Sequence, residues 1–183
     1  MRGRRSGRGN ATIEFTLVGI PLVFVLISTI EMARGMWIYH TLAYAVKEGT
    51  RYAVARGQNN SIQASQSGST PTTYNDVCNA VVQAGTGLLR EDLTLTFHSA
   101  TAADVTTPAD KCSSSLTWPP GDSAGVIDNQ PGQTISIKGL YPFVSAISMF
   151  WPGAGKGMTF QPLICKGAGT LCLPAVSQDV MQF

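Results

Sequence analysis

The sequence has little charge and few side chains that bind metals. Only 13% of its 183 residues are Asp, Glu, Lys or Arg, about half the share in an average soluble protein. It contains two histidines and four cysteines, and no two cysteines form a CxxC pair. Structural zinc sites use such closely spaced ligands, so we expect no metal site and no bound cofactor.

Basic residues are also scarce beyond the first nine positions. Arg2, Arg4, Arg5 and Arg8 belong to the 13 Lys and Arg residues, so without residues 1–9 the chain would have 13 − 4 = 9 basic and 11 acidic residues. A net charge of −2 does not suit phosphate binding, and we expect no nucleic-acid partner. The arginine cluster favours contact with anionic lipid on the cytoplasmic side of a membrane.

One long apolar run is present near the N-terminus. No residue from Phe15 to Ile30 is charged, and as a helix this run would be about 24 Å long. With its flanking residues it predicts a membrane span over about 13–33. A cleaved secretory signal is the competing interpretation, but the run continues into further helical sequence instead of ending at a cleavage site of small residues.

The helix is expected to extend beyond the membrane, over about 11–56. Apolar and small residues recur at spacings of four and three: Met32, Met36, Tyr39, Ala43, Val46, Thr50 and Ala53. Gly57 and the polar residues after it indicate the end of the helix. Pro21 is tolerated inside a membrane helix and predicts a bend. We therefore divide the chain into a leader (1–9), a long helix (10–57) and a body (58–183).

The body is expected to be a small α+β domain, with a helix packed on an antiparallel sheet. After a polar linker at 58–73, the apolar spacing from Val77 to Leu88 predicts an amphipathic helix, with Asn75 or Asp76 near its start. Alternating or apolar residues predict strands at 93–98, 134–138 and 158–165.

Two segments of the body are less regular. Residues 99–132 are poor in apolar side chains and contain several prolines and glycines, so they predict a long loop. The dense apolar run Leu140–Trp151 is too short to span a bilayer. It predicts either a buried hairpin or short helix, or a patch that faces a partner or the membrane.

The cysteines are Cys78, Cys112, Cys165 and Cys172. An even number in an exported body suggests two disulfides, and the pairing of sequence neighbours would join Cys78 to Cys112 and Cys165 to Cys172. Free buried thiols are the alternative.

The most informative residue is Glu14, whose carboxylate lies at the edge of the apolar helix. A charge inside a membrane costs at least about 2.5 kcal/mol near the centre and less toward an end. If a peptidase cut after Gly9, Asn10 would carry a new amino group, and Glu14 of a neighbouring subunit could pair with it. Without that spacing Glu14 would be a helix-end carboxylate at the lipid boundary, like Glu31.

Gly9 followed by Glu14 and Phe15 resembles the cleavage motif of type IV prepilins. Further blocks follow in order: Gly9-Asn10-Ala11-Thr12-Ile13-Glu14-Phe15 with Pro21-Leu22, then Ile30-Glu31-Met32-Ala33-Arg34, then Ala45-Val46-Lys47-Glu48-Gly49-Thr50-Arg51-Tyr52-Ala53. Together they are similar to the TadE-like family, the minor pilins or pseudopilins of the bacterial Tad (tight adherence, Flp-type) pilus. The resemblance covers about residues 9–57, and its Glu48-Gly49-x-Arg51 block is not required of a generic prepilin.

The resemblance implies roles for four residues. Gly9 and Asn10 would flank the cut made by a prepilin peptidase, Glu14 would mediate assembly, and Phe15 would help to define the site. The implied partners are the peptidase, other pilin subunits, the Tad assembly machinery and inner-membrane lipid. The implied function is pilus assembly for adherence, with the N-terminus cytoplasmic and the body periplasmic, or extracellular in a pilus.

A membrane-anchored periplasmic binding module, unrelated to filaments, is the alternative function. Residues 99–132 and 140–151 would then carry its specificity. We expect no enzymatic activity. Gly121–Gly125 matches the G-x-S-x-G pattern around Ser123, but prolines precede it and a loop-rich segment surrounds it. Gly153–Gly157 lacks the spacing of a phosphate-binding loop, and His98 is expected on the solvent face of a strand.

Overall fold

The computed structural model describes residues 10–56, 70–100, 102–118, 132–143 and 171–181. These segments form a long helix, a short helix and a four-stranded antiparallel sheet, which confirms the predicted α+β class. The elements are α1 (Asn10–Val54), α3 (Tyr74–Ala84), β1 (Thr94–His98), β2 (Val105–Pro108), the 3-10 helix η1 (Ala109–Lys111), β3 (Thr134–Phe143) and β4 (Leu171–Val180).

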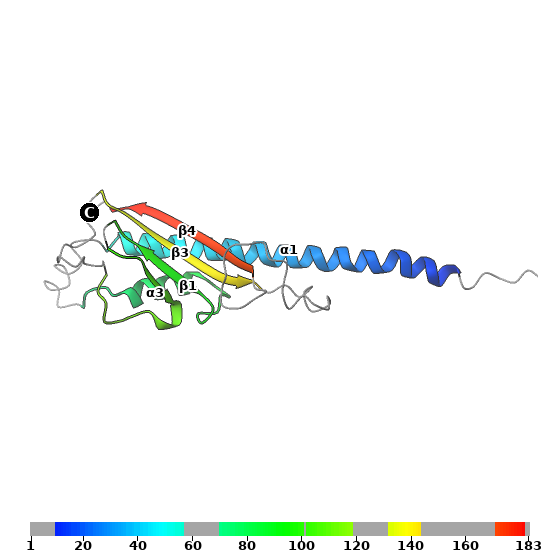
Figure 1. The fold of residues 1–183 in the computed structure, drawn as a ribbon, viewed down its shortest axis with the longest axis horizontal. Coiled ribbons are helices and arrows are strands. Elements are labelled where there is room, and N and C mark those ends of the chain that lie inside the picture. Colours follow the sequence, from blue (N-terminus) through cyan, green and yellow to red (C-terminus); the bar gives the residue numbers. More distant parts are fainter. Residues whose placement is uncertain (1–9, 57–69, 101, 119–131, 144–170, 182–183) are drawn as a thin grey trace, which may run out of the picture.

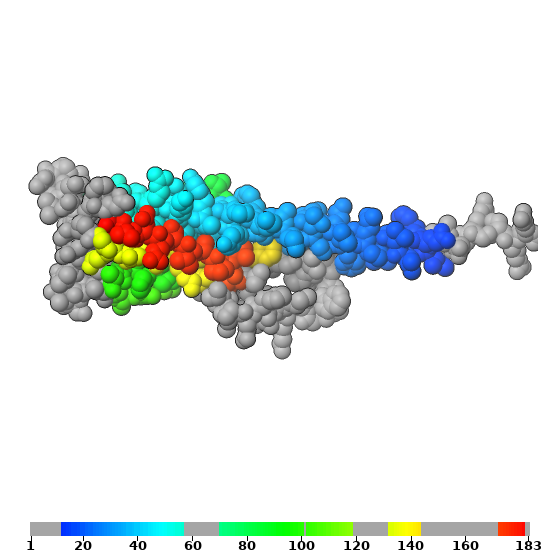
Figure 2. Space-filling model, turned by 90° about the horizontal axis from the view of Figure 1, so that it is seen from above, coloured from blue at the N-terminus to red at the C-terminus, as the bar shows by residue number. Residues whose placement is uncertain are grey.

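Helix α1 is 45 residues long, about 68 Å at 1.5 Å per residue. It continues through Pro21, where the bend stays a prediction. Its first half projects as a rod from the body, whereas its second half lies against the sheet (Figure 1; Figure 2). The buried residues of this second half are Ile38, Leu42, Ala45, Val46, Gly49, Thr50, Ala53 and Val54.

The predicted apolar stripe of α1 packs on the core from Ala43 onward, but its first three residues do not. Met32, Met36 and Tyr39 are exposed, and the buried face in this region passes through Ile38 and Leu42. Residues 30–46 are apolar on almost every side of the helix. Periodicity therefore does not select one face there, and contact with the body decides which side chains are buried.

Helix α3 begins at a capping box. Thr73 accepts a hydrogen bond from the backbone N–H of Asp76, and the Asp76 carboxylate accepts one from the backbone N–H of Thr73 at 2.8 Å. This reciprocal pair satisfies two N–H groups at the start of the helix. The helix ends at Ala84, before the predicted Leu88, because Gly85 serves as its C-cap.

The sheet order is β2-β1-β3-β4, with every neighbouring pair antiparallel. Each proline of the sheet lies at the same kind of position in its strand pair. Pro108 is opposite Thr94, Pro142 is opposite Cys172, and Pro174 is opposite Leu140. Proline has no N–H to donate, so these pairs are the non-hydrogen-bonded ones of each ladder. The backbone bonds just beyond the strands, Ala109 N–H to Leu93 O and Met181 N–H to Gln133 O, follow the same alternation.

The hydrophobic core lies between the sheet and the two helices. Gly139 of β3 lies under α1, because a Cβ at this position would be 2.7 Å from Cγ2 of Val46. An aromatic cluster of Tyr74, Phe97 and Trp118 lies at the end of the core away from the first half of α1. The Trp118 Nε1–H donates to Ala53 O at 3.0 Å. The core therefore contains the second half of α1, so the body is built on this helix.

Several strand predictions need comment. Residues 99–132 were expected to be a loop, but 105–108 form β2 and 109–111 form η1. This expectation was wrong there because Thr-rich residues 105–108 pair with β1 without an apolar alternation of their own. Leu140–Phe143 belong to β3, and the rest of the apolar run to Trp151 lies outside the described residues, as does the predicted strand 158–165. Strand β4 was not predicted.

Candidate functional site

The first half of α1 has an apolar and exposed surface. The helix is long and apolar enough to cross a membrane, and its most apolar stretch has no residue buried inside the protein. Exposed apolar side chains of this stretch include Leu17, Ile20, Leu22, Phe24, Leu26 and Ile30. Apolar surface of this extent is unfavourable in water and is consistent with a single-pass membrane anchor.

Polar side chains within this segment find partners in the helix itself. The hydroxyls of Thr16, Ser28 and Thr29 donate to the carbonyls of Thr12, Phe24 and Val25, at 2.8–2.9 Å. Such bonds to the preceding turn satisfy a hydroxyl that no water reaches. They leave an outer surface that is compatible with hydrocarbon.

Three of the residues to which the family resemblance assigns roles lie at the start of α1. Asn10 is its first residue, and Glu14 and Phe15 are exposed in its first two turns. Asn10 and Glu14 are four residues apart, about one turn along the helix. Residues 1–9, which include Gly9, lie outside the described part of the chain.

The neck of the molecule, residues 31–37 of α1, is where the rod meets the body. Arg34 lies 3.4 Å from the Glu31 carboxylate and 5.2 Å from the centre of the Phe143 ring. The Phe143 ring also covers Gly35, since a Cβ there would be 3.6 Å from it. A groove of about 720 Å³ runs beside the neck, lined mainly by Met32, Met36, Tyr39, Phe143 and Leu173. Sequence reasoning missed the neck, because it depends on a β3 residue more than 100 positions away.

The Glu48-Gly49-x-Arg51 block lies where α1 meets α3. Gly49 faces Val81 so closely that a Cβ on this glycine would overlap Cγ2 of the valine. Thr50 is buried and donates its hydroxyl to Val46 O at 2.9 Å. Glu48 and Arg51 form an ion pair of 3.2 Å on the outer side. The block therefore combines a close helix contact with a polar outer face.

The described geometry thus matches the expected layout of an apolar rod joined to a body. Residues 9–51 match the family model for TadE-like protein. This match confirms the resemblance drawn from the sequence blocks, and it associates the chain with the Tad pilus system. No curated protein and no solved structure matches the chain.

The TadE-like segment ends at Arg51, so most of the body lies outside the match. In the body, Cys78 and Cys112 form a disulfide with a Cα–Cα distance of 6.5 Å, as predicted. Cys172 is also disulfide-bonded, and its predicted partner Cys165 lies outside the described residues.

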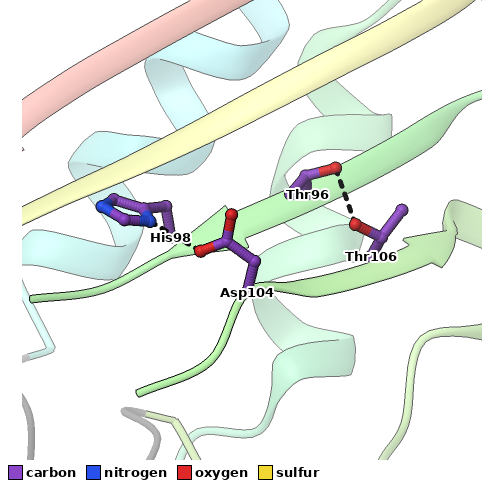
Figure 3. Close-up of polar contacts among 4 residues, drawn as sticks. All are labelled: Thr96, His98, Asp104 and Thr106. Atoms are coloured by element: carbon purple, nitrogen blue, oxygen red, sulfur yellow. Dashed lines mark hydrogen bonds and ion pairs between the residues drawn. The ribbon is translucent and has the colours of Figure 1, made fainter. Parts of the chain in front are cut away.

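The outer face of the sheet carries polar side chains. Figure 3 shows His98 directed toward Asp104 and Thr96 toward Thr106, with distances of 2.6 Å and 3.0 Å. His98 is exposed on β1, as expected. Within the described ranges, no group of three or more His, Cys, Asp or Glu residues could hold a metal ion. Ser123 and the 153–157 glycines lie outside those ranges.

Proposed function

We propose that the chain is a minor pilin or pseudopilin of a Tad-type pilus, made as a prepilin and cut between Gly9 and Asn10. One observation carries the proposal. From Asn10 to Arg51 the TadE-like match falls on a single helix, whose first half is an exposed apolar rod and whose second half forms part of the core of the body. Such a helix can be held in lipid and later surrounded by other subunits.

The chemistry of assembly follows from the charges at the start of α1. Exchanging lipid for neighbouring apolar helices changes the surroundings of the rod little, so apolar contact alone selects no register. After the cut, Asn10 would carry a positive amino group, and Glu14 of a neighbouring subunit would carry the opposite charge. Leaving either charge alone in an apolar environment is costly, so this pair would set the register between subunits.

The membrane orientation is part of the same proposal. Four arginines before the span favour a cytoplasmic N-terminus and place the body in the periplasm. The Cys78–Cys112 disulfide supports this orientation, because disulfides persist in oxidising compartments. We also propose that the protein has a structural role and no catalytic activity. If a preparation hydrolyses a test substrate, the Ser123→Ala variant should retain that activity.

The first test is the mature N-terminus. The full chain is coexpressed with a prepilin peptidase and with an inactive peptidase variant, and the intact mass is measured. The proposal expects loss of residues 1–9 only with the active peptidase. An uncut chain, or a cut at another position, contradicts it.

The second test is the Glu14→Ala substitution, with Thr16→Ala as its matched control. Thr16 is also exposed in the second turn, and its hydroxyl already bonds within the helix. Both variants should enter the membrane, but only Glu14→Ala should lose association with pilin subunits in pull-down from membranes. A membrane-anchored binding module would be unaffected by both, and equal behaviour of the two variants argues for it.

A further inference from the structure

The body touches α1 at two points that lie at almost the same height along the helix. On one side, the Phe143 ring at the end of β3 covers Gly35. On the other side, the turn after α3 packs on Trp37, because a Cβ at Gly87 would lie 2.7 Å from Cη2 of the indole. Gly35 and Trp37 are two residues apart, which is about 3 Å along a helix axis. Among the described residues of the body, these contacts lie at the end nearest to the rod.

The height of this end above a bilayer can be estimated from the helix. A hydrocarbon core of about 30 Å takes about 20 helical residues. Counted from Glu14, this places its outer boundary near Arg34, whose charge is paired with Glu31. Trp37 lies three residues farther, about 4.5 Å beyond the boundary, and the headgroup layer is about 5–7 Å thick.

Apolar and aromatic side chains are exposed at this height. Trp37 keeps 54% of its surface exposed although its ring touches Gly87, and Leu89 in the same turn is 55% exposed. The turn is held in place, because the Leu89 N–H donates to the Tyr141 hydroxyl at 3.3 Å. Tryptophan is enriched at the level of lipid headgroups, where its apolar ring and its polar N–H are both satisfied.

We propose that this surface, which we call the underside and define as Trp37, Gly87, Leu89 and Phe143, rests in the headgroup layer of a phospholipid bilayer. The surface is continuous with the membrane-length rod and lies at headgroup height on two sides of it. The two contact points fix the body to α1, so the helix cannot rotate or slide in the membrane without moving the underside. The proposal requires that α1 spans a membrane, and it does not depend on cleavage or filament assembly.

The test uses the full chain in vesicles of phosphatidylcholine and phosphatidylglycerol. Trp151→Phe leaves Trp37 and the buried Trp118, and Trp37→Phe in that background leaves Trp118 alone. The difference in fluorescence emission between these two variants reports Trp37. Nitroxide quenchers are attached either to the lipid headgroup or near the end of the acyl chains, and iodide is the quencher in water.

A matched pair of new tryptophans tests the rest of the underside in the Trp37→Phe, Trp151→Phe background. Leu89→Trp lies at the underside. Leu116→Trp is similarly exposed, at 49%, but it lies beside Trp118, whose indole bonds to Ala53. Ala53 is 16 residues beyond Trp37 along α1, about 24 Å farther from the bilayer.

The proposal expects headgroup nitroxide to quench Trp37 and Leu89→Trp more than acyl-chain nitroxide does, and to leave Leu116→Trp unquenched. Iodide should quench Leu116→Trp most. Equal iodide quenching of both new tryptophans, without lipid quenching, would overturn the proposal. Shielding of Leu89→Trp that grows with the protein-to-lipid ratio would assign the underside to a second copy and also overturn it. A chain that does not float with vesicles would overturn the membrane anchor itself, whereas a floating chain that stays uncut affects only the prepilin proposal.

Discussion

Gly49 is expected to be the position of α1 that least tolerates a methyl group. Substitution by alanine would place a Cβ on top of Cγ2 of Val81, and Val81 is fully buried. A β-branched side chain in a helix has one strongly preferred rotamer, so the valine cannot turn away. The two helices must therefore move apart or strain.

The magnitude follows from two opposing effects. Replacing glycine by alanine inside a helix gains about 1 kcal/mol of helix propensity. Overpacking of a filled core costs about 1–3 kcal/mol, and a buried β-branched neighbour favours the upper end of that range. We expect Gly49→Ala to lower the free energy of unfolding by about 2 kcal/mol.

The assay is urea unfolding of the full chain in detergent micelles, followed by near-ultraviolet circular dichroism of the aromatic cluster around Trp118. Gly35→Ala is the matched control on the same helix, because its Cβ would lie at an ordinary 3.6 Å from the Phe143 ring. This control should be unchanged or slightly stabilised.

A double-mutant cycle separates overpacking from other effects of the substitution. Val81→Ala removes the overlapping methyl group and leaves the Val81 Cβ position 3.5 Å from the new Cβ at residue 49. In that background Gly49→Ala should no longer destabilise, a coupling of about 2–3 kcal/mol. Parent-like stability of Gly49→Ala, or the same loss in both backgrounds, would refute the close contact.

Three further predictions use the same unfolding measurement. Replacing Cys78 and Cys112 by serine opens a loop with a sequence separation of 34. On the chain-entropy model the free energy of unfolding should fall by about 4 kcal/mol. An unchanged midpoint of urea unfolding would contradict this prediction. Thr73→Ala removes the N-cap of α3 and should cost about 1 kcal/mol, while Thr73→Ser should retain most of the stability. His98→Ala should leave stability within experimental error, because His98 and Asp104 are both more than half exposed; a clear loss would indicate a structural role for the pair.

The local elements of the fold could be predicted where one signal dominated. The long apolar run and the polar stop after it predicted α1 to within about two residues at its C-terminal end. The apolar spacing from Val77 placed α3, and alternation placed β1 and part of β3. Contacts between distant residues, such as Phe143 over Gly35, could not be predicted from spacing because no local pattern encodes them.

Strand β4 shows why alternation alone can miss a strand. Its second half contains Ser177, Gln178 and Asp179, and Pro174 interrupts its first half. Residues on an edge strand need not alternate strictly, since part of each face is open to solvent. The candidate site shows a similar limit of sequence reasoning. The resemblance singled out Gly49, but only the contact with Val81 gives a physical reason for a glycine there.

The proline in β4 also affects how copies of this protein behave when crowded. Among the described residues, strand β4 is the ten-residue edge of the sheet, and its even-numbered residues direct their backbone groups away from β3. Pro174 leaves a gap in this outward row of N–H donors, and the Val180 N–H is already taken by the Asp179 carboxylate at 2.8 Å. An incoming strand would meet an interrupted row of donors, which disfavours edge-to-edge aggregation. The described edge of the sheet is therefore protected against pairing between copies, even at high local concentration.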